Sequence, residues 1–356
     1  MMYAWEHPLY REDVRQVAGL SLPWEQLTGC TVLLTGASGM IGSFLADVLM
    51  ERNVAYGQGI RVVAMGRNAA RGAVRFAAYR GDAAFTFVAH DINTPIRADE
   101  VGTPDYLVHL ASNTHPVAYA TEPISTITTN IIGTGNVLSL ACEAGATRVA
   151  FCSSNEVYGE NRGDVELFRE DYCGYIDPNT LRAGYPESKR CGEALCQAYR
   201  KEKGLDVVIP RLTRTYGPTL LKSDTKALSQ FLNKGLAGED IVLKSAGTQY
   251  YSYLYVADSV AGLLTVLLQG GSGEAYNIAD EASDIRLKDL AALIAGHAGT
   301  RVVFDLPDAV EAAGFSRATK ARLDGAKLRA LGFAPRYAIA EGIARTMEML
   351  RETERV

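Results

Sequence analysis

Hydrophobic and polar positions follow two alternating patterns between residues 30 and 212. Short apolar runs, which are typical of buried parallel strands, alternate with longer segments whose apolar residues recur at helical spacing. Strands separated by helices in this way predict a parallel, doubly wound α/β sheet. The predicted strands are Thr31–Leu34, Arg61–Met65, Phe85–His90, Tyr106–Leu110, Arg148–Cys152 and Val207–Leu212, and the main predicted helices are Ile124–Ala144 and Pro186–Lys203.

A glycine-rich segment, Thr35–Gly42, joins the first predicted strand to a helical pattern. Gly36 permits a tight turn, Gly39 lets the backbone approach a pyrophosphate, and Gly42 lets the helix pack close to the strand. The helix N-terminus adds free N–H groups and a positive dipole. We therefore predict a dinucleotide-binding Rossmann fold whose loop residues contact the cofactor: Gly36, Ser38, Gly39, Met40, Ile41 and Gly42.

The identity of the dinucleotide depends on the end of the second predicted strand. An NAD-specific fold usually has an acid there that holds the ribose 2′-hydroxyl, whereas this chain has Arg67. An arginine can meet a 2′-phosphate or stack on adenine, so we expect NAD and keep NADP as an alternative. A solvated loop arginine is the simpler reading of Arg67. Further cofactor contacts are expected where the third and fourth strands end, at Asp91, Ile92, Leu110, Ala111 and Ser112.

The remaining segments suggest how the chain is divided. We interpret residues 1–29 as an N-terminal extension with a short helix near Arg11–Leu20, and residues 30–212 as the dinucleotide-binding domain, to which residues 254–278 return. Residues 213–253 and 279–356 are expected to form a smaller C-terminal α/β substrate-binding lobe over the carboxyl ends of the sheet. The elements predicted after residue 212 are strands near Ile241–Leu243 and Tyr276–Ile278 and helices at Asp258–Leu268 and Leu287–His297.

Candidate catalytic residues lie after the fifth predicted strand and at the start of the helix that follows it. Tyr185 and Lys189 are four positions apart, which places them on one face of a helix. A cation beside a phenol favours phenolate, so we expect Lys189 to lower the pKa of Tyr185 and make it a base. Ser154, at the end of a strand, can hydrogen-bond the same substrate oxygen. Together these residues can remove a proton from an alcohol while hydride leaves its carbon for a nicotinamide.

Composition excludes several classes of function. The formal net charge of −5 argues against a nucleic-acid partner and an anionic membrane surface. No apolar run is long enough to cross a membrane, and the charged N-terminus does not resemble a signal peptide. The cysteines form no C-x-x-C pair, and the histidines show no metal-ligand spacing with cysteines or acids, so we expect no metal. A cytoplasmic protein with reduced thiols is the expectation.

Several motifs together resemble one family, and the similarity runs from about Cys30 to the C-terminus. They are TGASGMIG at 35–42, HLAS at 109–112, SSNEVYG at 153–159, YPESK at 185–189, RTYGP at 214–218, YVADSV at 255–260 and YNIAD at 276–280. They resemble the NAD-dependent epimerase/dehydratase family, the extended short-chain dehydrogenase/reductases that act on nucleotide-diphosphate sugars. The resemblance implies that Ser154, Tyr185 and Lys189 are catalytic, that Tyr185 and Lys189 also contact the cofactor, and that Lys189 holds its nicotinamide ribose. It further implies C4 oxidation of the sugar on a bound NAD, and a homodimer formed through the helices Ile124–Ala144 and Pro186–Lys203.

The subtype is less clearly marked. Residues 109–116, 123–138 and 174–193 most resemble UDP-glucuronate decarboxylases, and dTDP-glucose 4,6-dehydratases are also similar. A C4 ketone acidifies the C5 proton, which Glu156 could take, but expelling the 6-hydroxyl needs an acid and Asn155 has no titratable proton. A 4-keto uronic acid loses carbon dioxide with little help. We therefore favour a decarboxylating lyase, then a dehydratase, with a 4-epimerase, an NADPH-dependent reductase and a non-catalytic cofactor sensor as alternatives.

Two positions depart from the family pattern. Tyr251 stands where family members usually have an arginine that holds the substrate diphosphate, and Arg214 stands where asparagine is usual. Our hypothesis is that Arg214 takes over the diphosphate, because the planar guanidinium suits phosphate oxygens. A structural ion pair is the alternative role for Arg214. His115 is a further candidate for contact with a sugar hydroxyl or carboxylate, or else packs within its loop.

Overall fold

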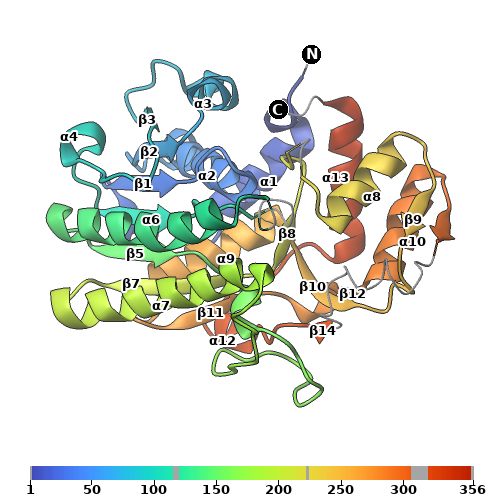
Figure 1. The fold of residues 1–356 in the computed structure, drawn as a ribbon. Helices are drawn as coiled ribbons and strands as arrows, with labels where there is room; N and C mark the ends of the chain where they lie inside the picture. The colour runs from blue at the N-terminus through green and yellow to red at the C-terminus, as the bar shows by residue number, and fades with distance from the viewer. Residues whose placement is uncertain (1, 115–118, 120, 222–223, 306–319, 354–356) are drawn as a thin grey trace.

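A parallel β-sheet forms the centre of the protein in the computed structural model, which describes residues 2–114, 119, 121–221, 224–305 and 320–353. Its strand order is β3-β2-β1-β4-β5-β7-β11, with β6 beside β7, and every pairing is parallel (Figure 1). This order confirms the predicted doubly wound Rossmann-like α/β fold. The strands are β1 (Thr31–Thr35), β2 (Arg61–Gly66), β3 (Phe85–Ala89), β4 (Tyr106–His109), β5 (Arg148–Phe151), β6 (Ser153–Ser154), β7 (Val207–Leu212) and β11 (Ala275–Ile278).

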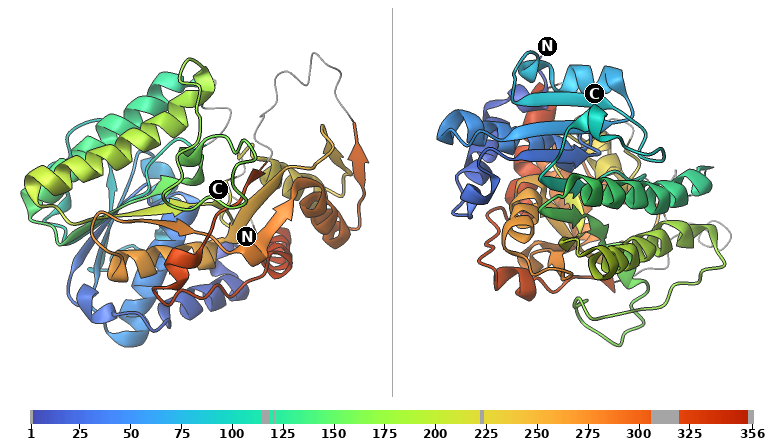
Figure 2. Two further views of the ribbon diagram at one scale, coloured as in Figure 1. Left: turned by 90° about the horizontal axis from the view of Figure 1, so that it is seen from below. Right: turned by 90° about the vertical axis from the view of Figure 1, so that its left-hand side faces the viewer.

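Helices cover both faces of this sheet, as the left view of Figure 2 shows. Adjacent residues of β1 point to opposite faces, so Val32 and Leu34 belong to one buried core and Leu33 to another. The first core holds helices α1 (Pro8–Ala18), α2 (Met40–Tyr56) and α9 (Val256–Gln269), and the second holds α6 (Pro123–Ala144) and α7 (Gly184–Lys203). Among the described residues, no helix has the length and apolar character that a membrane crossing requires.

The segment before β1 packs into the first core. Its helix begins at Pro8, two residues after the short 3₁₀ turn Ala4–Glu6, because Nδ1 of His7 accepts a hydrogen bond from the backbone N–H of Leu9. Tyr10, Val14 and Val17 are buried in that core, which also contains residues of α2 and α9. These residues are therefore part of the globular body.

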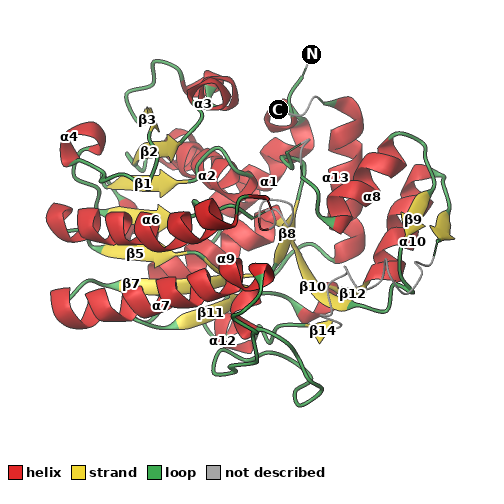
Figure 3. Ribbon diagram, in the orientation of Figure 1, coloured by secondary structure: helices red, strands yellow, loops and turns green. Residues whose placement is uncertain are grey.

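The smaller lobe is built on two short sheets (Figure 3). Its central strand, β10 (Tyr250–Tyr255), runs directly into α9, and β8 (Arg214–Tyr216) follows shortly after β7. Both connections tie the lobe to the carboxyl ends of the large sheet. Its other elements are β9 (Ile241–Leu243), β12 (Asp284–Arg286), β13 (Val302–Phe304), β14 (Lys320–Ala321), α8 (Ala227–Leu236), α10 (Leu287–Ala298) and α13 (Ile339–Glu352). The helices α3 (Ala69–Arg75) and α4 (Ala98–Val101) belong to the sheet region, and α12 (Ala326–Arg329) packs there against β11 and α9.

Candidate active site

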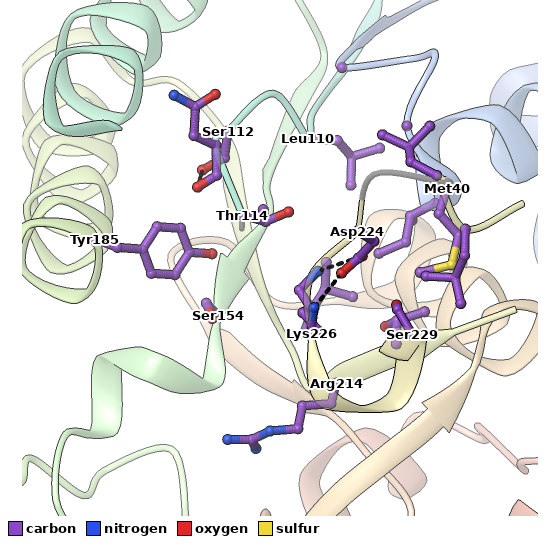
Figure 4. A pocket seen from close by; sticks show the side chains of 18 of the residues that line it. Met40, Leu110, Ser112, Thr114, Ser154, Tyr185, Arg214, Asp224, Lys226 and Ser229 are labelled. Carbon is purple, nitrogen blue, oxygen red and sulfur yellow. Dashed lines mark hydrogen bonds and ion pairs between the residues drawn. The ribbon is translucent and has the colours of Figure 1, made fainter. Parts of the chain in front are cut away.

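A cavity of about 1430 Å³ lies between the carboxyl ends of the parallel strands and the smaller lobe. This is where open α/β sheets bind ligands. The volume exceeds the roughly 300–1,000 Å³ of an ordinary small-molecule site, so a dinucleotide and a second molecule can share it. Figure 4 shows side chains from both halves of the protein entering this cavity.

The glycine-rich loop forms one wall and is shaped by close backbone approaches. Gly36 has a φ of 67°, and a Cβ there would lie 2.8 Å from the backbone of Ala111. A Cβ on Gly42 would lie 2.6 Å from the carbonyl oxygen of Gly36. Only glycine fits these two positions, and the resulting cradle at the N-terminus of α2 fits a pyrophosphate. All six predicted loop residues line the cavity: Gly36, Ser38, Gly39, Met40, Ile41 and Gly42.

A buried histidine ties this cradle to the neighbouring strand and helix. The hydroxyl of Thr134 donates to the carbonyl of Asn130 at 2.6 Å, so it can only accept from Nε2 of His109 at 3.1 Å. Nδ1 of His109 therefore accepts from the hydroxyl of Thr35 at 2.7 Å, and that hydroxyl accepts from the N–H of Ala111. Burial lowers the pKa of His109 to about 3, so the ring is neutral. Every donor in this chain has an acceptor, which leaves the end of β1 firmly held.

Of the other residues predicted to contact the cofactor, all but Asp91 line the cavity. Ile92, Leu110, Ala111, Ser112 and Arg67 line the cavity, and Nη2 of Arg67 donates to Oδ1 of Asn113 at 3.3 Å.

Asp91 does not line the cavity, because it closes a turn. Its Oδ1 accepts from the backbone N–H and the side-chain amide of Asn93, at 3.0 and 2.9 Å. His90 and Ile92 line the wall on either side of it, and Arg71, one helical turn after Arg67, lines it as well. The prediction of an adenine contact by Asp91 is therefore not supported by its position.

The predicted catalytic residues come together at one point of the cavity. Tyr185 projects from α7 between Ser112 and Ser154 (Figure 4), and Lys189 follows one turn later, almost fully buried. Nζ of Lys189 donates to the carbonyl of Cys152 at 2.9 Å, and burial lowers the pKa of Lys189 to about 8. The end of β5 and the first turns of α7 are thus joined by the lysine.

The pKa of Tyr185 moves in the direction opposite to our expectation. Burial raises it to about 12, although hydrogen bonds with Ser154 and Ser112 act in the other direction. Lys189 is not among the main groups that act on this pKa, and its ammonium group donates to the Cys152 carbonyl. Tyr185 in this environment keeps its proton at neutral pH, and it becomes a base only where an additional positive charge comes near.

An ion pair covers the outer side of Tyr185, and sequence reasoning missed half of it. Nη2 of Arg182 lies 2.7 Å from Oε2 of Glu156, and its guanidinium carbon lies 5.1 Å from the ring centre of Tyr119. Tyr119 stacks on Tyr185 with ring centres 4.8 Å apart. The only sequence signal for Arg182 was a cation three residues before Tyr185, while nothing marked Tyr119. Asn155, between Ser154 and Glu156, is buried.

Arg214 and Tyr251 lie side by side because β8 and β10 pair in parallel. The guanidinium carbon of Arg214 is 3.7 Å from the ring centre of Tyr251, and both residues line the cavity. Nη1 of Arg214 is buried without a hydrogen-bond partner, and among the described residues no carboxylate lies within ion-pair distance of it. Within the described part of the chain, a structural ion pair therefore does not account for Arg214. His115 lies outside the described residues.

Two lysines that sequence reasoning missed also line the smaller lobe's side of the cavity. Lys226 is ion-paired with Asp224 at 3.4 Å, and Lys244 with Asp305 at 2.5 Å. Among the described side chains, no group of three or more histidines, cysteines and acids could hold a metal ion.

Comparison with known proteins identifies the family. The model of the NAD dependent epimerase/dehydratase family matches residues 32–279. UDP-glucuronic acid decarboxylase 6 of Arabidopsis thaliana is 32% identical over 316 residues, which cover 88% of this chain and 86% of that protein. UDP-glucuronic acid decarboxylase 1 of Xenopus tropicalis is 32% identical over 90% of this chain and 72% of its own length.

Solved structures agree with this result. A dTDP-glucose 4,6-dehydratase from Streptomyces venezuelae, solved as a double mutant with NAD bound, has a TM-score of 0.77 and 28% identity, covering 90% of this chain and 97% of that one. A UDP-glucuronic acid 4-epimerase from Bacillus cereus has the same fold, with a TM-score of 0.77 and 21% identity over 90% of this chain and 99% of its own. The resemblance predicted from the motifs is confirmed: the chain is an enzyme that belongs to the NAD dependent epimerase/dehydratase family.

Proposed function

We propose that the protein is an NAD-dependent UDP-glucuronate decarboxylase, which oxidises C4 of the sugar, releases carbon dioxide and reduces C4 again. One observation carries this choice within the family: the strand end beside Tyr185 has a hydroxyl at Ser154 and an amide at Asn155, with no acid between Ser154 and Glu156. The similarity to UDP-glucuronic acid decarboxylases over most of the chain supports it.

The residues present fit a bound NAD. The cradle around Gly36 and Gly42 suits the pyrophosphate, Arg67 and Ile92 lie where the adenosine would extend, and Tyr185 and Lys189 would hold the nicotinamide ribose. Bound NAD supplies the hydride acceptor and, in its oxidised form, a positive charge beside the phenol. NADP stays an alternative, because no acid follows β2 and Arg67 suits a 2′-phosphate.

The first step removes the proton of the C4 hydroxyl group and the hydrogen bonded to C4. Tyr185, as phenolate, accepts the proton of the C4 hydroxyl while Ser154 donates a hydrogen bond to the same oxygen, and the C4 hydrogen leaves as hydride. The C4–O bond becomes a carbonyl, and Tyr185 is left protonated. Burial, which raises the pKa of Tyr185 to about 12, then keeps that proton in place.

The second step breaks the bond between C5 and the carboxyl carbon. The C4 ketone is β to the carboxylate, so carbon dioxide leaves and the bonding electrons pass to the C4 oxygen as an enolate. The protonated Tyr185 and Ser154 both donate hydrogen bonds to this oxygen, where negative charge develops. C5 then takes up a proton from solvent water as the enolate returns to a ketone, hydride returns to C4, and Tyr185 gives its own proton back to the C4 oxygen.

Decarboxylation by these steps needs no acid beside C6, and Asn155, which has an amide instead of a carboxyl group, is compatible with that. Dehydration would need an acid to protonate the departing 6-hydroxyl. Glu156 lies next to Asn155, but its carboxylate is paired with Arg182 at 2.7 Å. The role of Glu156 at C5 stays a prediction.

Arg214 is proposed to bind the substrate diphosphate, and the ring of Tyr251, on which the guanidinium of Arg214 stacks, is proposed to orient that guanidinium. The buried, unbonded Nη1 supports this role, because a guanidinium in a cavity gains most from an anionic ligand. Tyr251 itself cannot supply the charge of the usual arginine.

A homodimer is proposed through the outer face of α6. Ile124, Ile127 and Ile132 are 78%, 37% and 48% exposed, which is unusual for isoleucine on a helix. Light scattering of the wild type and of Ile132→Glu tests this: we expect a dimer that the variant weakens, and a monomeric wild type would refute it. The cytoplasmic location and the lack of a nucleic-acid partner stay predictions from composition.

The test of the proposed reaction is a panel of nucleotide sugars whose products are weighed by mass spectrometry. We expect UDP-glucuronate to lose carbon dioxide and Tyr185→Phe to leave it unchanged. Loss of water from an NDP-glucose identifies a dehydratase, an altered stereocentre at constant mass identifies an epimerase, and net oxidation of NADPH identifies a reductase. An unreacted panel with bound cofactor supports the sensor.

A further inference from the structure

A buried ion pair joins two helices that border the cofactor cavity. Asp47 lies on α2, two turns after the glycine-rich loop, and Arg75 lies at the end of α3. Nη2 of Arg75 is 2.5 Å from Oδ2 of Asp47, and the two side chains are only 5% and 8% exposed. The same nitrogen donates to the carbonyl of Ser43 in the first turn of α2 at 3.1 Å.

These contacts bear on the cavity because both helices line it. The first turn of α2 is the cradle proposed for the pyrophosphate, and α3 carries Arg71, directly after the strand end at Arg67. Arg75 therefore links α3, which carries part of the adenosine wall, to α2, which begins at the cradle. A buried ion pair stabilises such a link most when its remaining donors and acceptors are also satisfied.

The N-terminal segment supplies two of the groups that surround this ion pair, in which Nε of Arg75 is the one donor left buried without a hydrogen-bond partner among the described residues. The hydroxyl of Tyr10 donates to Oδ2 of Asp47 at 2.6 Å and accepts from Nη2 of Arg75 at 3.0 Å. The ring of Trp5 covers the guanidinium, whose carbon lies 4.5 Å from the ring centre. A third group, the hydroxyl of Tyr79, donates to Oδ1 of Asp47 at 2.8 Å.

Trp5 also lies close behind the glycine-rich loop. It lines a small cavity together with Arg75, and four other residues of that lining, Ser38, Arg71, Leu220 and Leu221, line the large cavity as well. One layer of side chains thus separates Trp5 from the cofactor space. The family model begins at residue 32, so this segment lies outside the region that it matches.

From this arrangement we infer that the N-terminal segment Ala4–Ala18 belongs to the dinucleotide site, with Trp5 and Tyr10 as positioning residues that hold the two cavity walls together and slow cofactor release. The inference rests on the proposed function in one respect, that the cavity binds a dinucleotide.

A purely structural role is the competing explanation, because the same segment contributes to the core. Val14 is buried on α1, and Asp13 accepts hydrogen bonds from Tyr255 at 2.6 Å and Tyr337 at 2.7 Å. Val14→Ala therefore serves as a matched control: it removes core packing from the same helix without touching the Asp47–Arg75 pair.

The test measures cofactor dissociation and thermal unfolding on the same four proteins. Wild type, Trp5→Ala, Tyr10→Phe and Val14→Ala are loaded with NADH, chased with excess NAD, and followed by the loss of bound-NADH fluorescence. We expect Trp5→Ala and Tyr10→Phe to release NADH about tenfold faster than wild type. Val14→Ala should lower the unfolding temperature and keep the wild-type rate.

The outcomes separate the two claims. Wild-type release rates in Tyr10→Phe and, where it folds, in Trp5→Ala overturn the positioning role. So does release from Val14→Ala that is as fast as release from these two variants. Tyr10→Phe loses only a hydroxyl, so it keeps the test open if Trp5→Ala does not fold. A wild type that binds no dinucleotide refutes the proposed function instead.

Discussion

The cofactor side and the substrate side of the cavity differ in how their polar groups are satisfied. On the cofactor side, Thr35, His109 and Thr134 form a closed hydrogen-bond chain beside a glycine cradle. On the substrate side, Arg214 keeps a buried nitrogen without a hydrogen-bond partner among the described residues. The polar groups of the cofactor side are hydrogen-bonded to one another without a ligand. On the substrate side, the guanidinium of Arg214 has a nitrogen that a ligand could bind. Substitutions should therefore act on cofactor geometry on one side and on substrate affinity on the other.

The largest effect is expected where the two sides meet, at Tyr185. Tyr185→Phe removes the group that transfers the C4 proton and should lower turnover about 10³-fold, while bound NAD stays at the wild-type level. Steady-state kinetics and the cofactor content of the purified protein measure both. Turnover within a factor of two of wild type would remove Tyr185 from the mechanism.

Gly36→Ala tests the rigidity of the cofactor side. A Cβ at this position meets the backbone of Ala111 at 2.8 Å, so we expect NAD affinity to fall about 100-fold. Gly57→Ala is the matched control, since Gly57 has nearly the same φ (63°) but no atom within 4 Å of the added Cβ. Titration calorimetry should show affinity lost only in Gly36→Ala. Equal losses would mean that backbone strain alone matters.

Arg214→Ala tests whether the guanidinium on the substrate side binds the substrate diphosphate. Loss of charge-assisted hydrogen bonds should raise KM for the nucleotide sugar about 10- to 100-fold with little change in kcat. Arg162→Ala is the control, because Arg162 also stacks on a tyrosine, Tyr175 at 4.1 Å, but does not line the cavity. An unchanged KM in Arg214→Ala would contradict the diphosphate role.

A smaller effect concerns the charge that the cofactor side lends to Tyr185. A positive charge favours phenolate, so oxidised NAD should lower the Tyr185 pKa from about 12 by about one unit or more. By linkage, NAD should bind more tightly as pH rises toward that value. NADH, whose nicotinamide ring is uncharged, is the control. The difference in tyrosinate absorbance between wild type and Tyr185→Phe measures the shift, and equal values with both cofactors would contradict it.

The cofactor side was also the easier half to predict from sequence. Its strands are continuous apolar runs, and Gly36 and Gly42 are needed by local backbone geometry, so the fold and the family were confirmed. Asp91 is engaged in an Asx turn with Asn93, which no strand pattern revealed, and its contact with the cofactor stays a prediction. No sequence motif marked Trp5 and Tyr10, the residues that we propose position the walls of the cofactor site.

Predictions on the substrate side depended on long-range contacts and were weaker. Arg182 pairs with Glu156 from a different segment, and no local pattern couples them. The predicted direction of the Tyr185 pKa shift was wrong, because spacing on a helix does not reveal how deeply Tyr185 is buried. It also does not reveal the hydrogen bond from Lys189 to the Cys152 carbonyl. The stacking of Arg214 on Tyr251 depends on the pairing of β8 with β10, which the short strands did not reveal.

The central claim is that hydride leaves C4 and returns to it on a cofactor that stays bound while carbon dioxide is lost. The most direct measurement is the mass of the product formed from UDP-glucuronate that carries deuterium at C4. We predict a product that has lost carbon dioxide and kept the deuterium. An unchanged substrate, or a product whose deuterium has passed to NADH in solution, would contradict the account.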